Sequence, residues 1–133
     1  MANKTIPAGF MDLLTKKAFA NLATLMQDGT PQVSPVWLDF ANGRIRVNTA
    51  RGRVKDKNMQ RNPAVAIAIL DPENPYRHLA IRGRVVRSTE EGADEHIDSL
   101  AKKYLGKEKY PGRRPGEVRV TYEIEPISVS TMG

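Results

Sequence analysis

The chain has 133 residues, no cysteine and a formal net charge of +6. This length suits a single domain, residues 1–133, with its own hydrophobic core, and the absence of cysteine excludes disulfides, thiol catalysis and cysteine-ligated zinc. No apolar run approaches the length of a membrane span, and the first residues do not form a signal peptide. We therefore expect a soluble cytoplasmic protein without a membrane partner.

The positive charge predicts an anionic partner, which could be nucleic acid, an acidic membrane surface or a phosphorylated small molecule. Nucleic-acid binders of this size interleave aromatic with basic residues, because bases stack on aromatic rings. Aromatic residues make up only 6% of this chain, and none lies between Phe40 and Tyr76, where the most basic segment falls. The charge therefore permits nucleic acid without favouring it.

The first part of the chain predicts one short helix and three strands. The hydrophobic spacing predicts a helix over residues 10–18 and strands over 19–26, 31–40 and 44–49. Asp28-Gly29 and Asn42-Gly43 are dipeptides typical of tight hairpin turns, and they separate the three strands. We expect these strands to form an antiparallel meander.

The segment 47–63 has the most informative pattern in the sequence. It predicts a strand that breaks at Gly52 into a short basic helix, which Asn62-Pro63 ends. A helix N-terminus exposes unpaired N–H groups and a partial positive charge, so basic side chains there add like charge. The basic residues at this end are Arg51, Arg53, Lys55 and Lys57. A phosphate bound at this corner would offset their repulsion; the alternative is a solvated basic face.

The rest of the chain predicts three or four more strands and one helix. Residues 64–70 are almost all apolar, as in a strand buried on both faces, and 71–77 is a proline-containing loop. A long strand is expected over 78–88 with a bulge at Gly83, then a helix from Thr89 to Lys103. A basic loop, 105–116, leads to a strand at 117–124 and a last edge at 127–130.

Six or seven antiparallel strands with two or three short helices predict a mainly β fold, as a small barrel or a strongly curled sheet. The sequence shows no recognisable catalytic group or metal site. His78 and His96 are the only histidines, and no carboxylate cluster at metal-ligand spacing accompanies them. We expect His96 to lie on the surface of its helix and His78 to have a structural or solvent-facing role.

Several short motifs follow one another in a specific order. Asp28-Gly29-x-Pro31-Gln32-x-Ser34-x-Val36 precedes a hairpin into 44–47, and Arg53-x-Lys55-x-x-Asn58 then leads to Asn62-Pro63. In this order, the motifs resemble the pyridoxamine 5'-phosphate oxidase-related split β-barrel family, from about residue 10 to residue 129. Within that family, the resemblance is greatest to the small bacterial proteins that bind the deazaflavin coenzyme F420. It implies a split β-barrel of the FMN-binding type and a homodimer with the cofactor at the interface.

The resemblance also implies a cofactor site. Arg53 and Lys55 match positions that bind the phosphate of a flavin or deazaflavin, and Asn58 matches one that supports the turn. The second strand would run along the ring system, and the end of the third would lie beside the ribityl chain and phosphate. The implied cofactor-binding residues are Gln32, Ser34, Pro35, Val36, Thr49, Ala50, Arg53, Lys55 and Asn58.

We expect an oxidoreductase that uses F420 as hydride donor or acceptor for a small unsaturated or quinone-like organic substrate. The alternatives are an FMN-dependent oxidoreductase of the same family and a non-catalytic cofactor-binding module. F420 carries a phosphodiester and a chain of glutamates, so the charge of +6 favours it over FMN, which offers one phosphate. Two questions stay open: whether Trp37 lines the pocket or fills the core or dimer interface, and whether the basic loop holds the polyanionic tail or is merely flexible.

Overall fold

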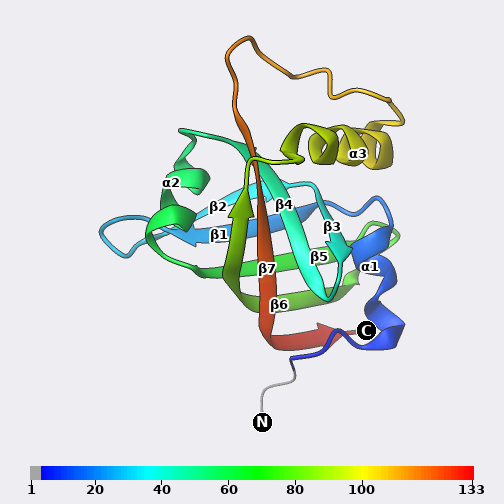
Figure 1. Cartoon of the computed structure of the whole chain (residues 1–133). Coiled ribbons are helices and arrows are strands. Elements are labelled where there is room, and N and C mark those ends of the chain that lie inside the picture. Colours follow the sequence, from blue (N-terminus) through cyan, green and yellow to red (C-terminus); the bar gives the residue numbers. More distant parts are fainter. Residues whose placement is uncertain (1–3) are drawn as a thin grey trace.

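The computed structural model of the protein describes residues 4–133, in which one curled antiparallel sheet is flanked by short helices (Figure 1). The helices in this part of the chain are a 3₁₀ helix (Ala8–Phe10), α1 (Asp12–Thr15), α2 (Val54–Arg61) and α3 (Ala93–Leu105). The strands are β1 (Ala20–Leu25), β2 (Pro31–Val36), β3 (Leu38–Ala41), β4 (Arg44–Ala50), β5 (Ala64–Asp71), β6 (Asn74–Thr89) and β7 (Arg119–Met132). The predicted fold class is confirmed.

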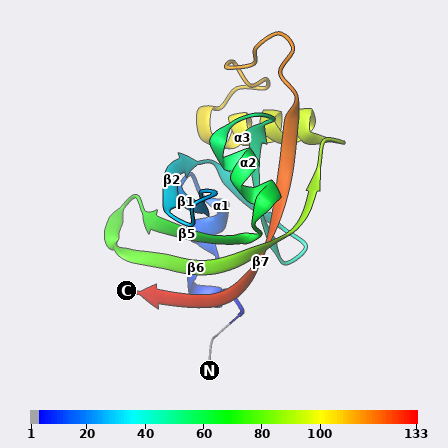
Figure 2. The same cartoon turned by 90° about the vertical axis from the view of Figure 1, so that its left-hand side faces the viewer.

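The strands of the described chain are hydrogen-bonded in the order β2-β1-β5-β6-β7-β4-β3, and every neighbouring pair is antiparallel. β2 and β3 therefore occupy opposite edges of the sheet, although only Trp37 separates them in sequence. One residue can join the two edges only if the sheet curls until they meet, and this curl makes the barrel. Figure 2 shows the wrapped strands from the side, with both termini at the end away from α3.

The prediction of one strand over 31–40, and of a three-stranded meander, is wrong. Within residues 4–133, β2 pairs only with β1, and β3 only with β4, so the two hairpins lie at opposite edges of the sheet. The turn dipeptides mark both hairpins correctly, but they carry no information about where each hairpin lies. Pro31 and Pro35 fit an edge strand, because proline lacks the N–H that a second neighbouring strand would need.

Two further boundaries differ from the prediction. Residues 74–77, expected in a loop, begin β6, because Pro72-Glu73 alone make the turn from β5. The first helix is only the 3₁₀ turn and α1, and α3 begins after Gly92 rather than at Thr89.

The strands expected at 117–124 and 127–130 are a single strand, β7. It pairs with β6 from Thr121 to Met132, and its first half also pairs with β4. The predicted bulge at Gly83 is confirmed by a shift of register between Arg82 and Gly83. A Cβ at position 83 would lie 2.6 Å from Cγ2 of Ile124, so only glycine lets β7 approach this closely.

The barrel interior is filled by apolar side chains that alternate along the strands. Its fully buried members include Leu22, Leu38, Ile45, Ile69, Leu79, Ile81 and Ile124. α3 packs on β4 and β7 across one end of the barrel, which Figure 1 shows at the top. The first half of β7 is therefore covered on both faces, by the core on one side and by α3 on the other.

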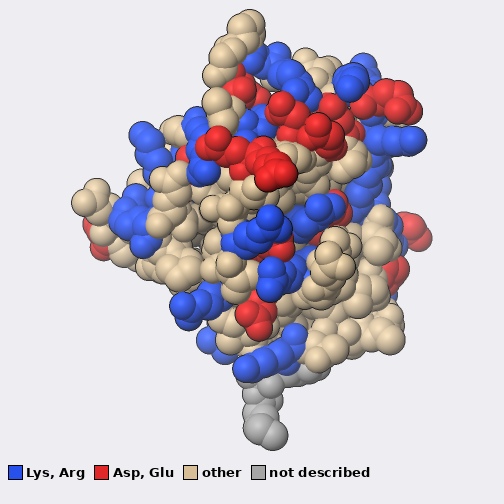
Figure 3. Space-filling model, in the orientation of Figure 1, with Lys and Arg blue, Asp and Glu red and all other residues tan. Residues whose placement is uncertain are grey.

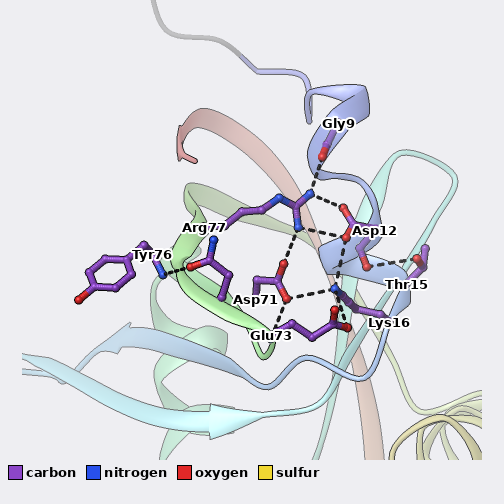
Figure 4. A network of polar contacts seen from close by, with 9 residues as sticks. Gly9, Asp12, Thr15, Lys16, Asp71, Glu73, Tyr76 and Arg77 are labelled. Carbon is purple, nitrogen blue, oxygen red and sulfur yellow. Dashed lines mark hydrogen bonds and ion pairs between the residues drawn. The ribbon is translucent and has the colours of Figure 1, made fainter.

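A network of charged side chains joins the N-terminal helices to the β5–β6 turn (Figure 4). Arg77 donates to both oxygens of Asp12 and, at 2.9 Å, to Oδ2 of Asp71, whose Oδ1 accepts from Lys16 at 3.1 Å. The Glu73 N–H first, and then Lys16 and Arg77, hold the pKa of Asp71 at about 2 against the opposite effect of burial.

Asp71→Asn should lower the melting temperature at neutral pH, because it removes the anion that pairs with Lys16 and Arg77. The pKa of Asp71 in the folded protein is below its ordinary value of 3.8. The contribution of the Asp71 carboxylate to stability is therefore complete above pH 3.8 and is lost as pH falls toward about 2. Thermal melts of the two proteins should therefore converge at acid pH. Glu125→Gln, a change of the same kind at an exposed acid outside this network, is the control. Equal melting temperatures at neutral pH would show that the network adds no stability.

Candidate functional site

A cavity of about 290 Å³ opens where the end of β2, the middle of β4, the start of α2 and one face of α3 meet. Segments far apart in the sequence build it, because the curled sheet brings the end of β2, the middle of β4 and the start of β7 together. Its lining residues are Phe19, Pro35, Val36, Trp37, Asn48, Arg53, Lys55, Ile97, Leu100, Tyr110 and Arg119. One end of this cavity is cationic and the other is aromatic.

The cationic end is formed by Arg53, Lys55 and Arg119. Arg53 is the N-cap of α2, Lys55 lies in its first turn, and Arg119 begins β7. Burial first, and then the charges of Arg53 and Arg119, hold the pKa of Lys55 below its ordinary value of 10.5. Like charges gathered in a partly buried place repel one another, so an anion bound among them would be stabilised.

Arg119 is held in place by three neighbours. Its Nε donates to Oδ1 of Asn48 at 2.9 Å, and its Nη1 donates to Oε1 of Glu117 at 2.7 Å. The ring of Tyr110 covers the guanidinium, whose carbon lies 5.2 Å from the ring centre. Among the described residues, none accepts a hydrogen bond from Nη2 of Arg119. This donor therefore remains for a ligand.

Trp37 lines the aromatic end of the cavity, which answers the question that the sequence left open. Its ring stacks on Tyr104 at 5.3 Å between centres, and Tyr110 meets it edge-on at 5.9 Å. Tyr104 is anchored in turn, because its hydroxyl donates to the carbonyl of Ala18 at 2.7 Å. The half-buried indole is thus a rigid, flat wall suited to a planar ring.

The start of α2 holds an acid as well as its cations. Asp56 is 2% exposed and accepts from the Gly52 N–H at 2.9 Å and from the hydroxyl of Tyr122 at 2.6 Å. Arg51 pairs with Asp56 at 3.0 Å and with Glu90 at 2.8 Å. The first turn therefore does complement the helix dipole, and the charge of Arg51 is used within the fold.

Four of the predicted site residues line the cavity: Pro35, Val36, Arg53 and Lys55. Ala50 lies two residues beyond Asn48 on the same face of β4. The structure does not bring Gln32, Ser34, Thr49 and Asn58 to the cavity.

These four residues face the protein interior instead. Asn58 is 1% exposed and its Nδ2 donates to Oγ1 of Thr24 at 3.0 Å, which ties α2 to β1. The same Thr24 hydroxyl donates to Oε1 of Gln32 at 3.3 Å. The buried hydroxyls of Ser34 and Thr49 have no hydrogen-bond partner among the described residues.

The prediction that His96 lies on the surface is wrong. Its side chain is 3% exposed, with Nδ1 3.0 Å from the hydroxyl of Thr121 and Nε2 3.3 Å from Oδ2 of Asp39. Nδ1 also lies 3.3 Å from Nδ2 of Asn48, which links His96 to the residue that holds Arg119. His96 is buried because α3 packs this face onto β4 and β7.

Sequence reasoning missed Asn48, Arg119 and Glu117. In the predicted strand, Glu117 and Arg119 alternate with apolar residues, which is the pattern of a solvent-facing side. They are buried because α3 and the loop 106–118 cover that side, and no local sequence signal reports this covering.

The loop 106–118 is tied to α3 through Asp98. Oδ1 of Asp98 accepts from the Tyr110 N–H and from Nη2 of Arg113, both at 2.8 Å, and Lys109 lies 3.6 Å from Oδ2. Burial raises the pKa of Asp98, but the three donors together lower it by more than burial raises it. The pKa of Asp98 therefore lies below its ordinary value of 3.8. The anchored loop places the Tyr110 ring over Arg119. Part of its basic charge is thus paired with α3.

Residues 6–133 match the sequence profile of the pyridoxamine 5'-phosphate oxidase family, so the chain belongs to that family. Among solved structures, an F420 reductase is 31% identical, with a TM-score of 0.83 over 94% of this chain and 98% of the reductase. A conserved hypothetical protein from Mycobacterium tuberculosis is 20% identical, with a TM-score of 0.73 over 97% of this chain and 86% of that protein. HupZ from Group A Streptococcus is 20% identical, with a TM-score of 0.69 over 96% of this chain and 94% of that protein.

The last two likenesses show the fold alone. No curated protein sequence matches the chain at a significant level. Of the helices in residues 4–133, none has both the length and the apolar character that crossing a bilayer requires. Members of this family bind a flavin or deazaflavin and include F420- and FMN-dependent oxidoreductases.

The residues of the cavity fit such a group. A flavin or deazaflavin has a planar ring system at one end and a phosphate toward the other, and the cavity has the Trp37 wall at one end and three cations at the other. The lowered pKa of Lys55 and the free Nη2 donor of Arg119 are both features that a bound phosphate would relieve. Arg53, Lys55 and Arg119 are the residues that would hold it.

FMN affinity should fall as pH rises toward the pKa of Lys55, because burial and the charges of Arg53 and Arg119 hold that pKa below its ordinary value of 10.5 and the ammonium loses its proton there. A bound phosphate stabilises the protonated form, so binding weakens as that form disappears. Lys55→Arg should give a flat profile, since a guanidinium stays charged. Fluorescence titrations at several pH values measure both. An equally flat profile for the wild-type protein would show that Lys55 is not a phosphate ligand.

Proposed function

We propose that the protein is an oxidoreductase that uses coenzyme F420 as hydride donor or acceptor for a small unsaturated or quinone-like organic substrate. The observation that carries this proposal is the convergence of Arg53, Lys55 and Arg119 on one end of a cavity whose other end is aromatic. The 31% identity with an F420 reductase over nearly the whole chain supports the choice of F420. The net charge of +6 supports it too, because F420 carries more negative charge than FMN.

The protein residues in this proposal bind and orient rather than exchange protons. When bound, F420 supplies the hydride from a carbon of its own ring, so the protein needs no nucleophile or metal of its own. The three cations would hold the phosphate, and the Trp37 ring would offer a flat surface to the ring system. Leu100 and Ile97 of α3 exclude water from the apolar end.

We further propose that the protein acts as a homodimer with its cofactor at the interface. A cavity of about 290 Å³ is at the lower limit of typical ligand sites, as expected if a second subunit completes the walls. Phe19, just before β1, and Val33, on β2, support this, because their apolar side chains are 58% and 63% exposed. The mass in solution, measured by light scattering, tests the oligomeric state.

The first alternative is an FMN-dependent oxidoreductase with the same site. On the face shown in Figure 3, the Lys and Arg side chains are scattered rather than gathered in one patch, and Asp and Glu cluster near its upper part. The proposal rests on the cations of the cavity, and these suit either phosphate. Titration with both cofactors separates the two proposals: tight FMN binding without affinity for F420 would overturn the choice of F420.

The Arg53→Ala, Lys55→Ala double variant should weaken F420 binding by about 3 kcal/mol, because it removes two charge-assisted phosphate contacts. Fluorescence titration of the purified protein measures this loss. Lys57→Ala is the matched control, since Lys57 is an exposed cation of the same helix outside the cavity, and it should leave the affinity unchanged. Unchanged affinity in the double variant would remove the phosphate site.

The second alternative, a non-catalytic cofactor-binding module, is separated by turnover. Reduced F420 bound to the protein should be oxidised when an enone or a quinone is added, at a rate above that of free F420. Absorbance of the deazaflavin reports the reaction. No acceleration across a broad panel of acceptors would favour a carrier or sensor.

A further inference from the structure

Glu117 is a buried carboxylate placed among the cations of the cavity. Its side chain is 7% exposed, and it joins two of the three cations: Oε1 accepts from Arg119 at 2.7 Å, and Oε2 lies 4.0 Å from Nη2 of Arg53. A carboxylate beside a site that attracts anions works against the attraction. The cations and Glu117 together leave the cationic end with a formal charge of +2, one less than the cations alone.

The fold does not require a full negative charge at this position in order to hold Arg119. Asn48 already binds Nε, and the Tyr110 ring covers the guanidinium plane. A neutral oxygen at position 117 would also accept the hydrogen bond from Nη1. The feature that only the carboxylate supplies is its negative charge, which lies next to two of the three cations of the cavity, Arg119 and Arg53.

The charge of Glu117 distinguishes between the two candidate cofactors. A phosphodiester, as in F420, carries one negative charge at neutral pH, whereas a phosphomonoester, as in FMN, carries nearly two. Repulsion from a nearby carboxylate scales with the charge of the ligand, so it penalises the phosphomonoester more. Low exposure strengthens the effect, because little water screens the pair.

We propose that Glu117 is a specificity-determining residue, which favours a singly charged phosphodiester over a doubly charged phosphomonoester at the Arg53–Lys55–Arg119 end of the cavity. This inference rests on the proposed function, since it assigns the phosphate of the cofactor to that end. The three cations alone would bind the phosphomonoester of FMN more tightly than the phosphodiester of F420. The charge of Glu117 gives the chain a means of rejecting FMN.

The test compares three ligands with the wild-type protein and Glu117→Gln. The glutamine keeps an oxygen for Arg119 and removes the charge. The variant should strengthen FMN binding about tenfold more than F420 binding, as expected for one extra unit charge at close range. Riboflavin, which has no phosphate, should bind both proteins alike. Dissociation constants from fluorescence titration are the readout, so no turnover is needed.

Glu123→Gln is the matched control. Glu123, on β7, also bridges two arginines, Arg44 at 3.0 Å and Arg87 at 2.8 Å, but neither of these arginines lines the cavity. It should leave the ratio of FMN to F420 affinities unchanged. Glu117→Ala provides a second uncharged variant if the glutamine is poorly folded, and the folded fraction of each is checked by thermal melting.

The outcomes separate the two claims. A wild-type protein that binds neither cofactor overturns the proposed function and the role of Glu117 with it. A protein that binds a cofactor, but whose Glu117 variants change FMN and F420 affinities equally or not at all, overturns the specificity role alone. The specificity role is supported if the Glu117 variants gain more affinity for FMN than for F420 and Glu123→Gln does not.

Discussion

The curl of the sheet is the constraint on which the rest of this structure depends. Because β2 and β3 lie at opposite edges and only Trp37 joins them, the edges must come together at Trp37, and the sheet closes on itself there without a ladder between β2 and β3 in the described chain. Closure brings the ends of β2, β4 and β7 together, and α3 packs across this end. Trp37 is thus both the joint between the edges and one wall of the cavity. The site exists because the barrel closes there.

The electrostatics of the cavity follow from this closure. β7 begins with Arg119, and Glu117 lies two residues before it. The cation and the carboxylate that pairs with it therefore both lie beside the cations of α2. Lys55 has a lowered pKa because it is partly buried near Arg53 and Arg119. Arg51, just before α2, pairs with Asp56 in the first turn of that helix. The result is a small cationic end whose charge is set by one acid.

Part of the site could be predicted from local patterns. The strand, glycine and basic helix at 47–63 placed Arg53 and Lys55 at a helix start, and both line the cavity. Asn58 belongs to the same motif, but its amide serves the packing of α2 on β1. His96 was expected at the surface, and Glu117 and Arg119 were not recognised as residues of the site. The reason in both cases is that α3 covers this part of β4 and β7, which is a long-range contact.

Hydrophobic alternation and turn dipeptides determined that this chain is mainly β with short helices, and the motif order determined its family, because these signals reside in neighbouring residues. The tertiary structure alone decided that residues 31–41 split between two edges, that Arg119 joins the α2 cations, and that Trp37 faces the cavity. Each of these depends on contacts between segments tens of residues apart. Local sequence patterns do not record such contacts, since the free energy that selects them comes from packing the whole barrel.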